Sequence, residues 1–275
     1  MGYGITERFQ ILSLDGGGIK GLYSAAVLAN LEQDLRTHII DHFDLIVGTS
    51  TGGIIALGLG LGMSPRQIVQ FYVEHGPQIF RNANPLKHWF FRKYPQQPLR
   101  AALRQCFGDR RLADSQKRLV IPSYNLDADD VYLFKTPHHT RFKRDYRTPV
   151  WQVALATSAA PTYFPACDDI DSIRLIDGGV WANNPTMIGI IEAISMLDVP
   201  RKAIAVCNLG TSDSVVHRNK RLNSGGKWAW AQSATDVILR GQSLGAHKQA
   251  CHLLGDDKVK RLDPKVPGGL FQMDR

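Results

Sequence analysis

The sequence predicts an α/β protein, a three-layer α/β/α sandwich with a mainly parallel central sheet. Two observations predict this fold. Short apolar runs typical of buried strands alternate with longer runs of helical character along most of the chain. The chain has 275 residues, of which 44% are apolar, enough to bury a large core in one unit. Because the sequence contains neither an internal repeat nor a low-complexity linker, we expect residues 1–275 to form a single domain.

The expected elements alternate as such a sandwich requires. The first two strands are apolar runs, and each leads through a glycine-rich turn into a helix. One helix boundary has a specific signal, because Ser64-Pro65 places an N-cap residue before a proline at the first helical position. The expected strands are residues 9–14, 43–47, 118–126, 130–135, 173–176 and 203–209. The expected helices are residues 19–36, 50–62, 65–75, 98–107, 150–157, 185–197 and about 229–250.

The string Gly48-Thr49-Ser50-Thr51-Gly52-Gly53 has the form of a nucleophile elbow. It lies between an expected buried strand and a helix that stays apolar despite its glycines. Gly48 and Gly52 allow the tight turn, which holds the Ser50 hydroxyl out at the carboxyl end of the strand. A glycine-rich turn with a helix-capping serine or threonine is the competing interpretation, because the pattern also occurs by chance. The position between strand and helix favours Ser50 as a nucleophile.

A second string, Asp15-Gly16-Gly17-Gly18-Ile19-Lys20-Gly21, follows the first expected strand. Consecutive glycine amides at a helix start can converge on one point and stabilise an oxyanion, by about 3–4 kcal/mol for each donor. Gly16, Gly17 and Gly18 are therefore candidates for an oxyanion hole, together with the amide of Thr51. A phosphate-binding loop does not fit, because the lysine precedes the last glycine instead of following it, and a dinucleotide-binding fingerprint fails on register. A turn without a ligand stays open for this string taken alone.

Far downstream, Asp177-Gly178-Gly179 follows the short apolar run 173–176. The run is typical of a strand that delivers Asp177 into a turn, and Asn183-Asn184-Pro185 then offers a helix start. Asp177 is a candidate general base for Ser50. Aspartate before two glycines is also a common turn composition, so a structural role is the competing interpretation.

Taken together and in this order, the three strings resemble those of the patatin-like phospholipases. The resemblance spans Phe9 to about Gly210 and includes Ser158-Ala159-Ala160-Pro161, which is similar to the family's segment ahead of its catalytic aspartate. Asn208-Leu209-Gly210-Thr211 is similar to a later family motif, except that Ser212 replaces its final glycine. This departure lies outside the three strings and affects only the expected local loop geometry.

The resemblance implies a serine hydrolase with a Ser-Asp dyad that releases fatty acids from phospholipids or related lipids. By position, Ser50 would be the nucleophile, Asp177 the base and Gly16 to Gly18 the oxyanion hole. Transfer of the acyl group to a lipid alcohol instead of water is an alternative reaction of the same residues. A non-catalytic module that binds lipid or nucleotide on the same fold is a further alternative, disfavoured because all three strings are intact.

A Ser-His-Asp triad is the alternative arrangement, because three histidines follow Asp177 in the sequence. His217 lies in a polar stretch typical of solvated surface, whereas His247 and His252 lie in an expected helix. Surface or packing roles fit all three better than catalysis. The four cysteines are scattered, without the spacing of a metal site or a disulfide framework. We therefore expect neither a metal nor a cofactor.

The chain is basic, with 33 lysines and arginines against 25 acidic residues and a formal net charge of +8. The excess concentrates in residues 81–104, where Trp89-Phe90-Phe91 is flanked by cations. Such a mixture can dock on an anionic phospholipid membrane surface. An amphipathic cap over the active site, with its aromatics turned inward, explains the composition equally well. We do not expect binding of a nucleic acid polymer, because a basic patch is its only support.

The sequence as a whole resembles bacterial patatin-like phospholipases that act in antiviral (anti-phage) defence and are switched on by a cyclic dinucleotide. The resemblance implies a cyclic dinucleotide activator and assembly into a homo-oligomer. Two basic clusters, Arg141-Phe142-Lys143-Arg144 and His217-Arg218-Asn219-Lys220-Arg221, are candidates for contacts with its two phosphates. Solvated surface charge is the competing interpretation of each cluster.

The sequence contains no apolar signal segment at its N-terminus, and residues 53–63, its best apolar stretch, are too few to cross a bilayer. We therefore expect a cytoplasmic protein that lies peripherally at the inner membrane when active.

Overall fold

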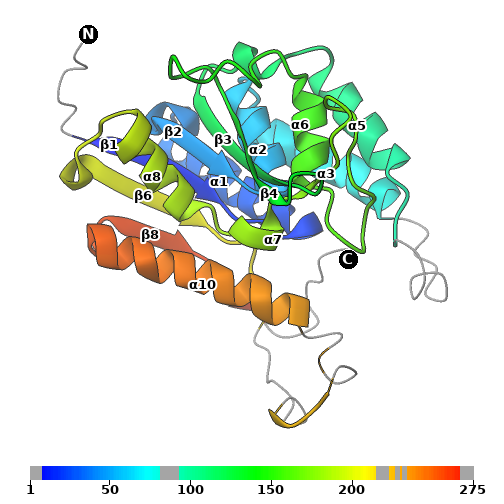
Figure 1. Ribbon diagram of the computed structural model, residues 1–275. Helices are drawn as coiled ribbons and strands as arrows, with labels where there is room; N and C mark the ends of the chain where they lie inside the picture. The colour runs from blue at the N-terminus through cyan, green and yellow to red at the C-terminus, as the bar shows by residue number, and fades with distance from the viewer. Residues whose placement is uncertain (1–7, 81–92, 215–222, 227–229, 231–233, 267–275) are drawn as a thin grey trace.

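A computed structural model describes residues 8–80, 93–214, 223–226, 230 and 234–266. Among these residues, seven strands form a central sheet with helices on both faces, which confirms the predicted three-layer α/β/α sandwich (Figure 1). Along the sheet the strands follow the order β4-β3-β2-β1-β6-β8, and β5 pairs with β3. The strands are β1 (Phe9–Leu14), β2 (Leu45–Gly48), β3 (Arg118–Asn125), β4 (Asp130–Lys135), β5 (Leu175–Asp177), β6 (Ile204–Leu209) and β8 (Val259–Leu262).

The helices form the two outer layers (Figure 1). One face of the sheet is covered by α1 (Gly21–Leu35), α2 (Thr51–Gly60), α3 (Pro65–Ile79), α5 (Gln97–Phe107) and α6 (Val150–Thr157). The other face is covered by α8 (Thr186–Met196) and α10 (Ala234–Leu254), and the short α7 (Gly179–Ala182) contacts both β3 and α10. The smaller elements are η1 (Gly18–Lys20), η2 (Ile39–His42), η3 (Leu112–Asp114), η4 (Arg201–Ala203) and the strand pair β7 (Asp213–Ser214) and β9 (Lys265–Val266).

Alternate side chains along each strand pack into different helical layers. Leu12 and Ile46 join the core under α1 and α2, whereas Ile11 and Leu45, one position away, join the core under α8. Pairings among β3, β2, β1, β6 and β8 are all parallel, and only β4 and β5 run antiparallel to β3. Because both faces of these strands are buried, their sequences are nearly continuous apolar runs, which made them recognisable.

Several expected boundaries differ from the structure. The first helix begins as the 3-10 turn η1, because Gly18 adopts a positive φ of 61° that an α-helix cannot include. The helix expected at 185–197 is preceded by the separate turn α7, and the last helix spans Ala234–Leu254. Strand β8 was not predicted, since Val259-Lys260-Arg261-Leu262 is a short edge strand with two adjacent cations in its middle and is neither a continuous apolar run nor an alternating one.

Pairing along β3 determines where Ser50 and Asp177 lie. Residues 45–47 of β2 pair in parallel with 118–120, the first half of β3. Strand β5 pairs antiparallel with residues 123–125 of β3. Because β4 occupies the other side of β3 over this length, β5 must lie on the same side as β2. The two strands therefore run toward each other, and the turn that follows β2 meets the end of β5.

Two glycines of the elbow are required by close backbone approaches. A Cβ at Gly48 would lie 2.2 Å from the carbonyl oxygen of Gly52, and a Cβ at Gly52 would lie 2.3 Å from the carbonyl oxygen of Leu14. Backbone atoms of a buried strand cannot move aside as a flexible side chain can. The β1 and β2 turns therefore pack together only with glycine at these positions.

We predict that Gly52→Ala lowers the free energy of unfolding by about 3 kcal/mol or more, because the methyl group meets the backbone of β1. Gly241→Ala is the matched control: Gly241 is exposed in α10 with no heavy atom within 4 Å of a Cβ, and alanine there should stabilise by about 0.5–1 kcal/mol. Chemical denaturation of both variants measures the difference. A Gly52→Ala protein as stable as the wild type would contradict the packing argument.

Candidate active site

Ser50 occupies the sharp turn between β2 and α2. Its backbone has φ 56° and ψ −123°, a conformation that costs a residue with a side chain about 1–3 kcal/mol. Ser50 N–H donates to Thr157 Oγ1 at 3.0 Å, and Thr157 Oγ1 donates to the carbonyl of Pro122 at 2.6 Å. Ile54 N–H donates to the Ser50 carbonyl at 3.1 Å. These bonds to α6, β3 and α2 hold the strained turn, which has the geometry expected of a nucleophile elbow.

The side chains of Ser50 and Asp177 are in direct contact. Ser50 Oγ donates to Asp177 Oδ2 at 2.6 Å, and Gly179 N–H donates to the other carboxylate oxygen, Oδ1, at 2.7 Å. Ser50 is 9% exposed and Asp177 is 5% exposed. Within the described part of the chain, no histidine bonds to either carboxylate oxygen. The arrangement allows a proton to pass directly from the serine hydroxyl to the carboxylate.

Burial raises the pKa of Asp177 to about 7, although hydrogen bonds from Ser50 and Gly179 act to lower it. Among the described residues no cation takes part in this balance, so desolvation of the carboxylate prevails. An aspartate with its ordinary pKa would be a poor proton acceptor near neutral pH. A pKa near 7 makes the Asp177 carboxylate basic enough for general base chemistry while leaving much of it ionised.

The glycine loop after β1 lies next to Ser50. A Cβ at Gly16 would be 3.2 Å from the Ser50 Cβ. The N–H of Gly16 already donates to the carbonyl of Asn183 at 3.0 Å. By contrast, the N–H groups of Gly17 and Gly18 donate to no other group among the described residues. Two of the three predicted glycine amides are therefore available to stabilise negative charge beside Ser50.

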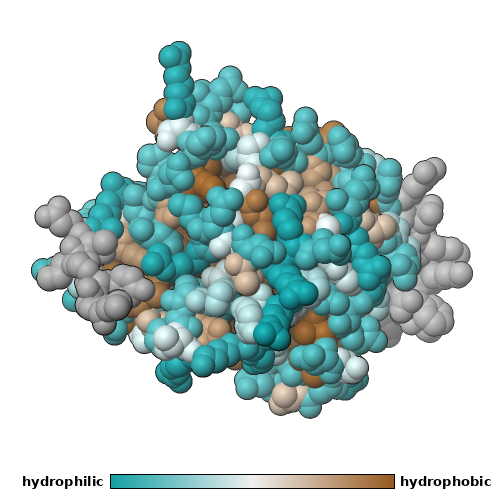
Figure 2. Space-filling model, turned by 90° about the horizontal axis from the view of Figure 1, so that it is seen from above, coloured by the Kyte–Doolittle hydropathy of each residue, from teal (hydrophilic) through white to brown (hydrophobic). Residues whose placement is uncertain are grey.

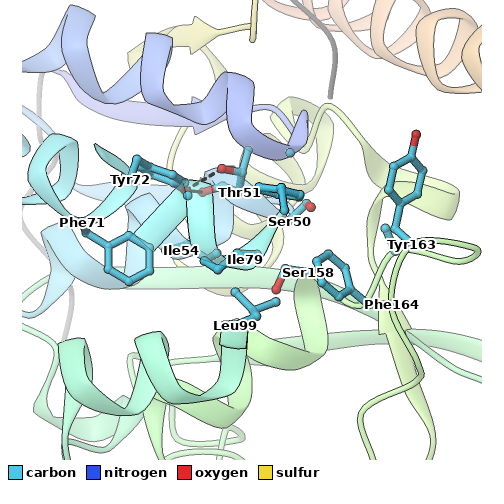
Figure 3. A pocket seen from close by; sticks show the side chains of 14 residues that line it. Ser50, Thr51, Ile54, Phe71, Tyr72, Ile79, Leu99, Ser158, Tyr163 and Phe164 are labelled. Carbon is cyan, nitrogen blue, oxygen red and sulfur yellow. Dashed lines mark hydrogen bonds between the residues drawn. The ribbon is translucent and has the colours of Figure 1, made fainter. Parts of the chain in front are cut away.

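An apolar pocket with an enclosed volume of about 50 Å³ opens beside Ser50 (Figure 3). Figure 3 shows Tyr163 and Phe164 on one side of Ser50 and Phe71 with Ile54 on the other. The full lining is Gly18, Ser50, Thr51, Ile54, Phe71, Tyr72, Gly76, Ile79, Phe80, Leu99, Ser158, Ala160, Tyr163 and Phe164. These residues come from several separate elements, so no local sequence pattern could have indicated the pocket. Its walls suit a hydrocarbon chain.

Two of the three histidines that follow Asp177, His247 and His252, hydrogen-bond to neither Ser50 nor Asp177. On α10, both ring nitrogens of His247 lie 3.8–3.9 Å from Cys251 Sγ, and burial lowers the pKa of His247. His252 also lies on α10, and His217 lies outside the described residues. In the described ranges, no group of three or more His, Cys, Asp or Glu side chains could hold a metal ion. The absence of a metal or cofactor stays a prediction.

A buried polar network beneath the glycine loop was not predicted from the sequence. Arg261 Nη1 lies 2.8 Å from Asp15 Oδ2, and Asn208 Nδ2 donates to Asp15 Oδ1 at 2.7 Å. On the other side of the loop, Asn183 Nδ2 donates to Ser243 Oγ in α10 at 3.0 Å. The one available signal was polar residues inside or beside apolar strands, such as Asn208 in β6. These contacts tie the loop to the last third of the chain.

Comparison with known proteins agrees with this geometry. The family model described as patatin-like phospholipase matches residues 12–190, from β1 into α8. The chain belongs to the patatin-like phospholipase family. It is therefore an enzyme of the lipid acyl hydrolase class, and the predicted family and enzyme class are confirmed. The match includes all three glycine-rich strings, but it does not extend to β6, α10 or β8.

Bacterial relatives of this patatin-like protein carry a more specific name. A "cGAMP-activated phospholipase" from Pseudomonas aeruginosa is 34% identical over 267 residues, covering 94% of this chain and 79% of the relative. One from Escherichia coli is 38% identical over 239 residues, covering 80% and 67% respectively. Among solved structures, VipD from Legionella pneumophila aligns with a TM-score of 0.45 and 12% identity over 85% of this chain and 56% of VipD, too low to add to the assignment.

The surface features predicted from the sequence are only partly described. Arg144 in the first basic cluster pairs with Asp145 at 2.8 Å and lies 3.9 Å over the ring of Tyr132, so it is already engaged. The second cluster, residues 217–221, and the aromatic residues 89–91 lie outside the described residues. On the described part of the face in Figure 2, the surface is mostly hydrophilic, with small apolar patches. No helix in the described ranges has the length and apolar character needed to span a membrane.

We predict that Asp177→Asn stabilises the protein above pH 7. The folded-state pKa of Asp177, about 7, exceeds its ordinary value of 3.8. The contribution of this pKa shift to the free energy of unfolding is therefore fully present below about pH 4, where the carboxyl group is neutral, and is lost as pH rises through 7. The amide never ionises, so we expect the Tm at pH 8 to rise by about 2–4 °C or more. The difference from wild type should shrink toward pH 5.

Asp127→Asn is the control, because hydrogen bonds from the backbone and side chain of Arg174 lower the pKa of the Asp127 carboxyl group. That exposed substitution should not stabilise the protein at pH 8. Calorimetric scans from pH 5 to pH 8 compare the two variants. Equal Tm values for wild type and Asp177→Asn at every pH would show that Asp177 is not destabilised by ionisation.

Proposed function

We propose that this protein hydrolyses acyl esters of membrane phospholipids, with Ser50 as nucleophile and Asp177 as general base. The observation that carries the proposal is the 2.6 Å hydrogen bond from Ser50 Oγ to Asp177 Oδ2 at the mouth of an apolar pocket. The carboxylate is buried, oriented by Gly179 and shifted to a pKa near 7. Membership of the patatin-like family supports the same reaction class.

The reaction proceeds in two halves. Asp177 accepts the proton of Ser50 Oγ as this oxygen attacks the ester carbonyl carbon, and the carbonyl oxygen becomes an oxyanion. Collapse of the tetrahedral intermediate breaks the ester bond, and the protonated Asp177 returns its proton to the leaving alcohol. Water then attacks the acyl-serine and gives its proton to Asp177. Collapse of this second tetrahedral intermediate breaks the bond between the acyl carbon and Ser50 Oγ, Asp177 returns the proton to Oγ, and the fatty acid leaves.

The glycine loop stabilises the oxyanion in both halves. Gly16 to Gly18 form the loop, and within it the amides of Gly17 and Gly18 are the free donors, since the Gly16 amide is bonded to Asn183. The Thr51 amide, the first of α2, is a further donor. Donors fixed by the fold before the substrate arrives need no reorganisation in the transition state, and each typically contributes about 3–4 kcal/mol.

The pocket selects an apolar acyl chain. Its lining contains aromatic and aliphatic side chains, and Ser50 lies at one part of the wall. An acyl chain in this pocket would leave its ester carbonyl beside Ser50 and its polar head group toward solvent. Transfer to a lipid alcohol instead of water is the second candidate reaction, since the pocket would also admit an alcohol with an apolar tail.

In this proposal the enzyme acts in antiviral defence, and a cyclic dinucleotide activates it. Support comes from the bacterial relatives, which are named as cGAMP-activated phospholipases and are 34% and 38% identical. The exposed Arg141 and Lys143 of the first basic cluster are candidate phosphate contacts. Assembly into a homo-oligomer and docking on an anionic membrane surface are the accompanying steps, and residues 86–95 are the candidate docking segment.

The roles of Ser50 and Asp177 lead to one prediction. Ser50→Ala and Asp177→Asn should each reduce ester hydrolysis by about 10⁴-fold or more, because the nucleophile or its proton acceptor is lost. Ser50→Ala should also abolish covalent labelling by a fluorophosphonate. His247→Ala and His252→Ala should keep activity within about threefold of wild type, since neither bonds to Asp177. A large loss at either histidine, or labelling of a folded Ser50→Ala protein, would refute the dyad.

Activation leads to a second prediction. Cyclic GMP–AMP should bind the full chain in calorimetry and raise hydrolysis of phosphatidylglycerol and phosphatidylethanolamine liposomes by about tenfold or more, within the range of typical allosteric coupling. Cyclic di-GMP and cyclic di-AMP serve as comparison ligands. Full activity without any ligand, together with no detectable binding, would contradict activation and leave a constitutive phospholipase.

A further inference from the structure

A row of polar side chains crosses the sheet on the side of α8 and α10. The registers pair Ser13 of β1 with Asn208 of β6, and Asn208 with Arg261 of β8. Paired residues of neighbouring parallel strands point to the same face, so the three side chains form a ladder within an otherwise apolar sheet. Asn208 Nδ2 donates to the Ser13 carbonyl at 3.1 Å, and Asn208 Oδ1 accepts from Arg261 Nη1.

The guanidinium of Arg261 binds three acceptors at once. Besides Asn208 Oδ1, it contacts Asp15 Oδ2 and Asp263 Oδ2, each at 2.8 Å. The side chain of Arg261 is 10% exposed and that of Asp15 is 3% exposed. The planar guanidinium suits these acceptors because its donors lie on separate nitrogens, with Asp15 and Asn208 on Nη1 and Asp263 on Nη2, whereas the three donors of a lysine ammonium all radiate from one nitrogen. Arg261 is therefore specified by its surroundings and is not interchangeable surface charge.

Asp15 is the residue directly before the glycine loop. Its carboxylate is held by Arg261 and Asn208, and its N–H donates to the Leu209 carbonyl at 3.0 Å. Both ends of Asp15 are thus bonded to β6 and β8 rather than to the elbow. Asp15 is joined directly to Gly16, so the position of the Asp15 backbone determines where the loop amides lie.

We infer that Arg261 is a positioning residue for the oxyanion loop, acting through Asp15 to aim the glycine amides at Ser50. The inference rests on the proposed function, because it presupposes that the loop stabilises an oxyanion. Arg261 lies on β8, beyond the residues 12–190 that the family model matches. Ser50, Asp177 and the glycine loop therefore lie within the matched region, but the cation that pairs with Asp15 comes from outside it.

Burial makes the ion pair sensitive to removal of either partner. The pKa of Asp15 is raised to about 7 by burial, and Arg261 is the strongest of the groups that lower it. Without Arg261, the Asp15 carboxylate would keep only its bond to Asn208 in a site closed to water. The side chain would then take up a proton or turn toward solvent, and either change moves the start of the glycine loop.

The test is steady-state hydrolysis of a soluble p-nitrophenyl ester by Arg261→Gln, under the conditions that give the wild type its highest turnover. We expect kcat to fall by about tenfold or more, with KM within about twofold, because the aligned amides stabilise the transition state and not the bound ester, so their misalignment lowers kcat alone. Circular dichroism and thermal scans establish the folded fraction, and kcat is corrected for it. An unchanged kcat in the folded variant would overturn the inference.

Lys135→Gln is the matched control for loss of a buried ion pair. Lys135 Nζ lies 2.5 Å from Glu192 Oε2, with side-chain exposures of 14% and 4%, between β4 and α8 and away from the glycine loop. This variant should lose stability, as Arg261→Gln does, but keep the kcat of its folded fraction. An equal fall of kcat in both variants would mean that Arg261 acts only through general stability and would refute positioning.

A double variant covers the case in which Arg261→Gln alone does not fold. Asp15→Asn combined with Arg261→Gln replaces the buried charges with two amides that can bond to each other and to Asn208. We expect the double variant to regain both stability and at least part of kcat relative to Arg261→Gln. Regained stability with no gain in kcat would show that the loop does not need this contact, which overturns the inference.

The Ser50→Ala variant, assayed in parallel, distinguishes a failure of the proposed function from a failure of the inference about Arg261. If Ser50→Ala retains hydrolysis, the proposed function fails. If Ser50→Ala is inactive while folded Arg261→Gln has the wild-type kcat, only the inference about Arg261 fails.

Discussion

Ser50 and Asp177 meet because β2 and β5 approach each other from opposite directions along one side of β3. Strand pairing fixes both backbones, so little freedom is left to the two side chains at the junction. Ser50 Oγ and Asp177 Oδ2 are in contact at 2.6 Å at this junction. Strand β1 is parallel to β2 and ends at the same level, so its glycine loop reaches the same point. The site thus follows the general rule for open parallel sheets that ligands bind beyond the carboxyl ends of the strands.

The site contains two buried carboxyl groups with different surroundings. Burial raises the pKa of both Asp15 and Asp177 to about 7. Asp15 faces the guanidinium of Arg261, which balances its charge, whereas Asp177 receives only neutral donors from Ser50 and Gly179. Asp15 bonds to groups of the polar network in β6 and β8, whereas Asp177 contacts the Ser50 hydroxyl, so Asp177 is the one placed to exchange a proton with Ser50. The different surroundings therefore suit Asp15 to a structural role and Asp177 to proton transfer.

The parts of the site that depend on local backbone geometry could be predicted from the sequence. Gly48 and Gly52 leave a recognisable pattern because neighbouring backbones exclude a Cβ, and the same holds for the turn after Asp177. Long-range contacts leave no such pattern. Arg261 is one cation in an edge strand of mixed polarity, and its importance arises from a sheet register with β6 that no short motif encodes. The pocket was missed for the same reason, since its walls join residues from Gly18 to Phe164.

The wide separation of the bonded residues has a consequence for synthesis of the protein. Asp15 and Asn208 are 193 positions apart, and Arg261 comes later still. Domains generally fold as units. A nascent chain that has reached α8 contains Ser50 and Asp177, but none of the three residues that bond to Asp15 has yet been made. If Arg261 positions the glycine loop as inferred above, the loop becomes aligned only after β6 and β8 join the sheet, and the site is completed last.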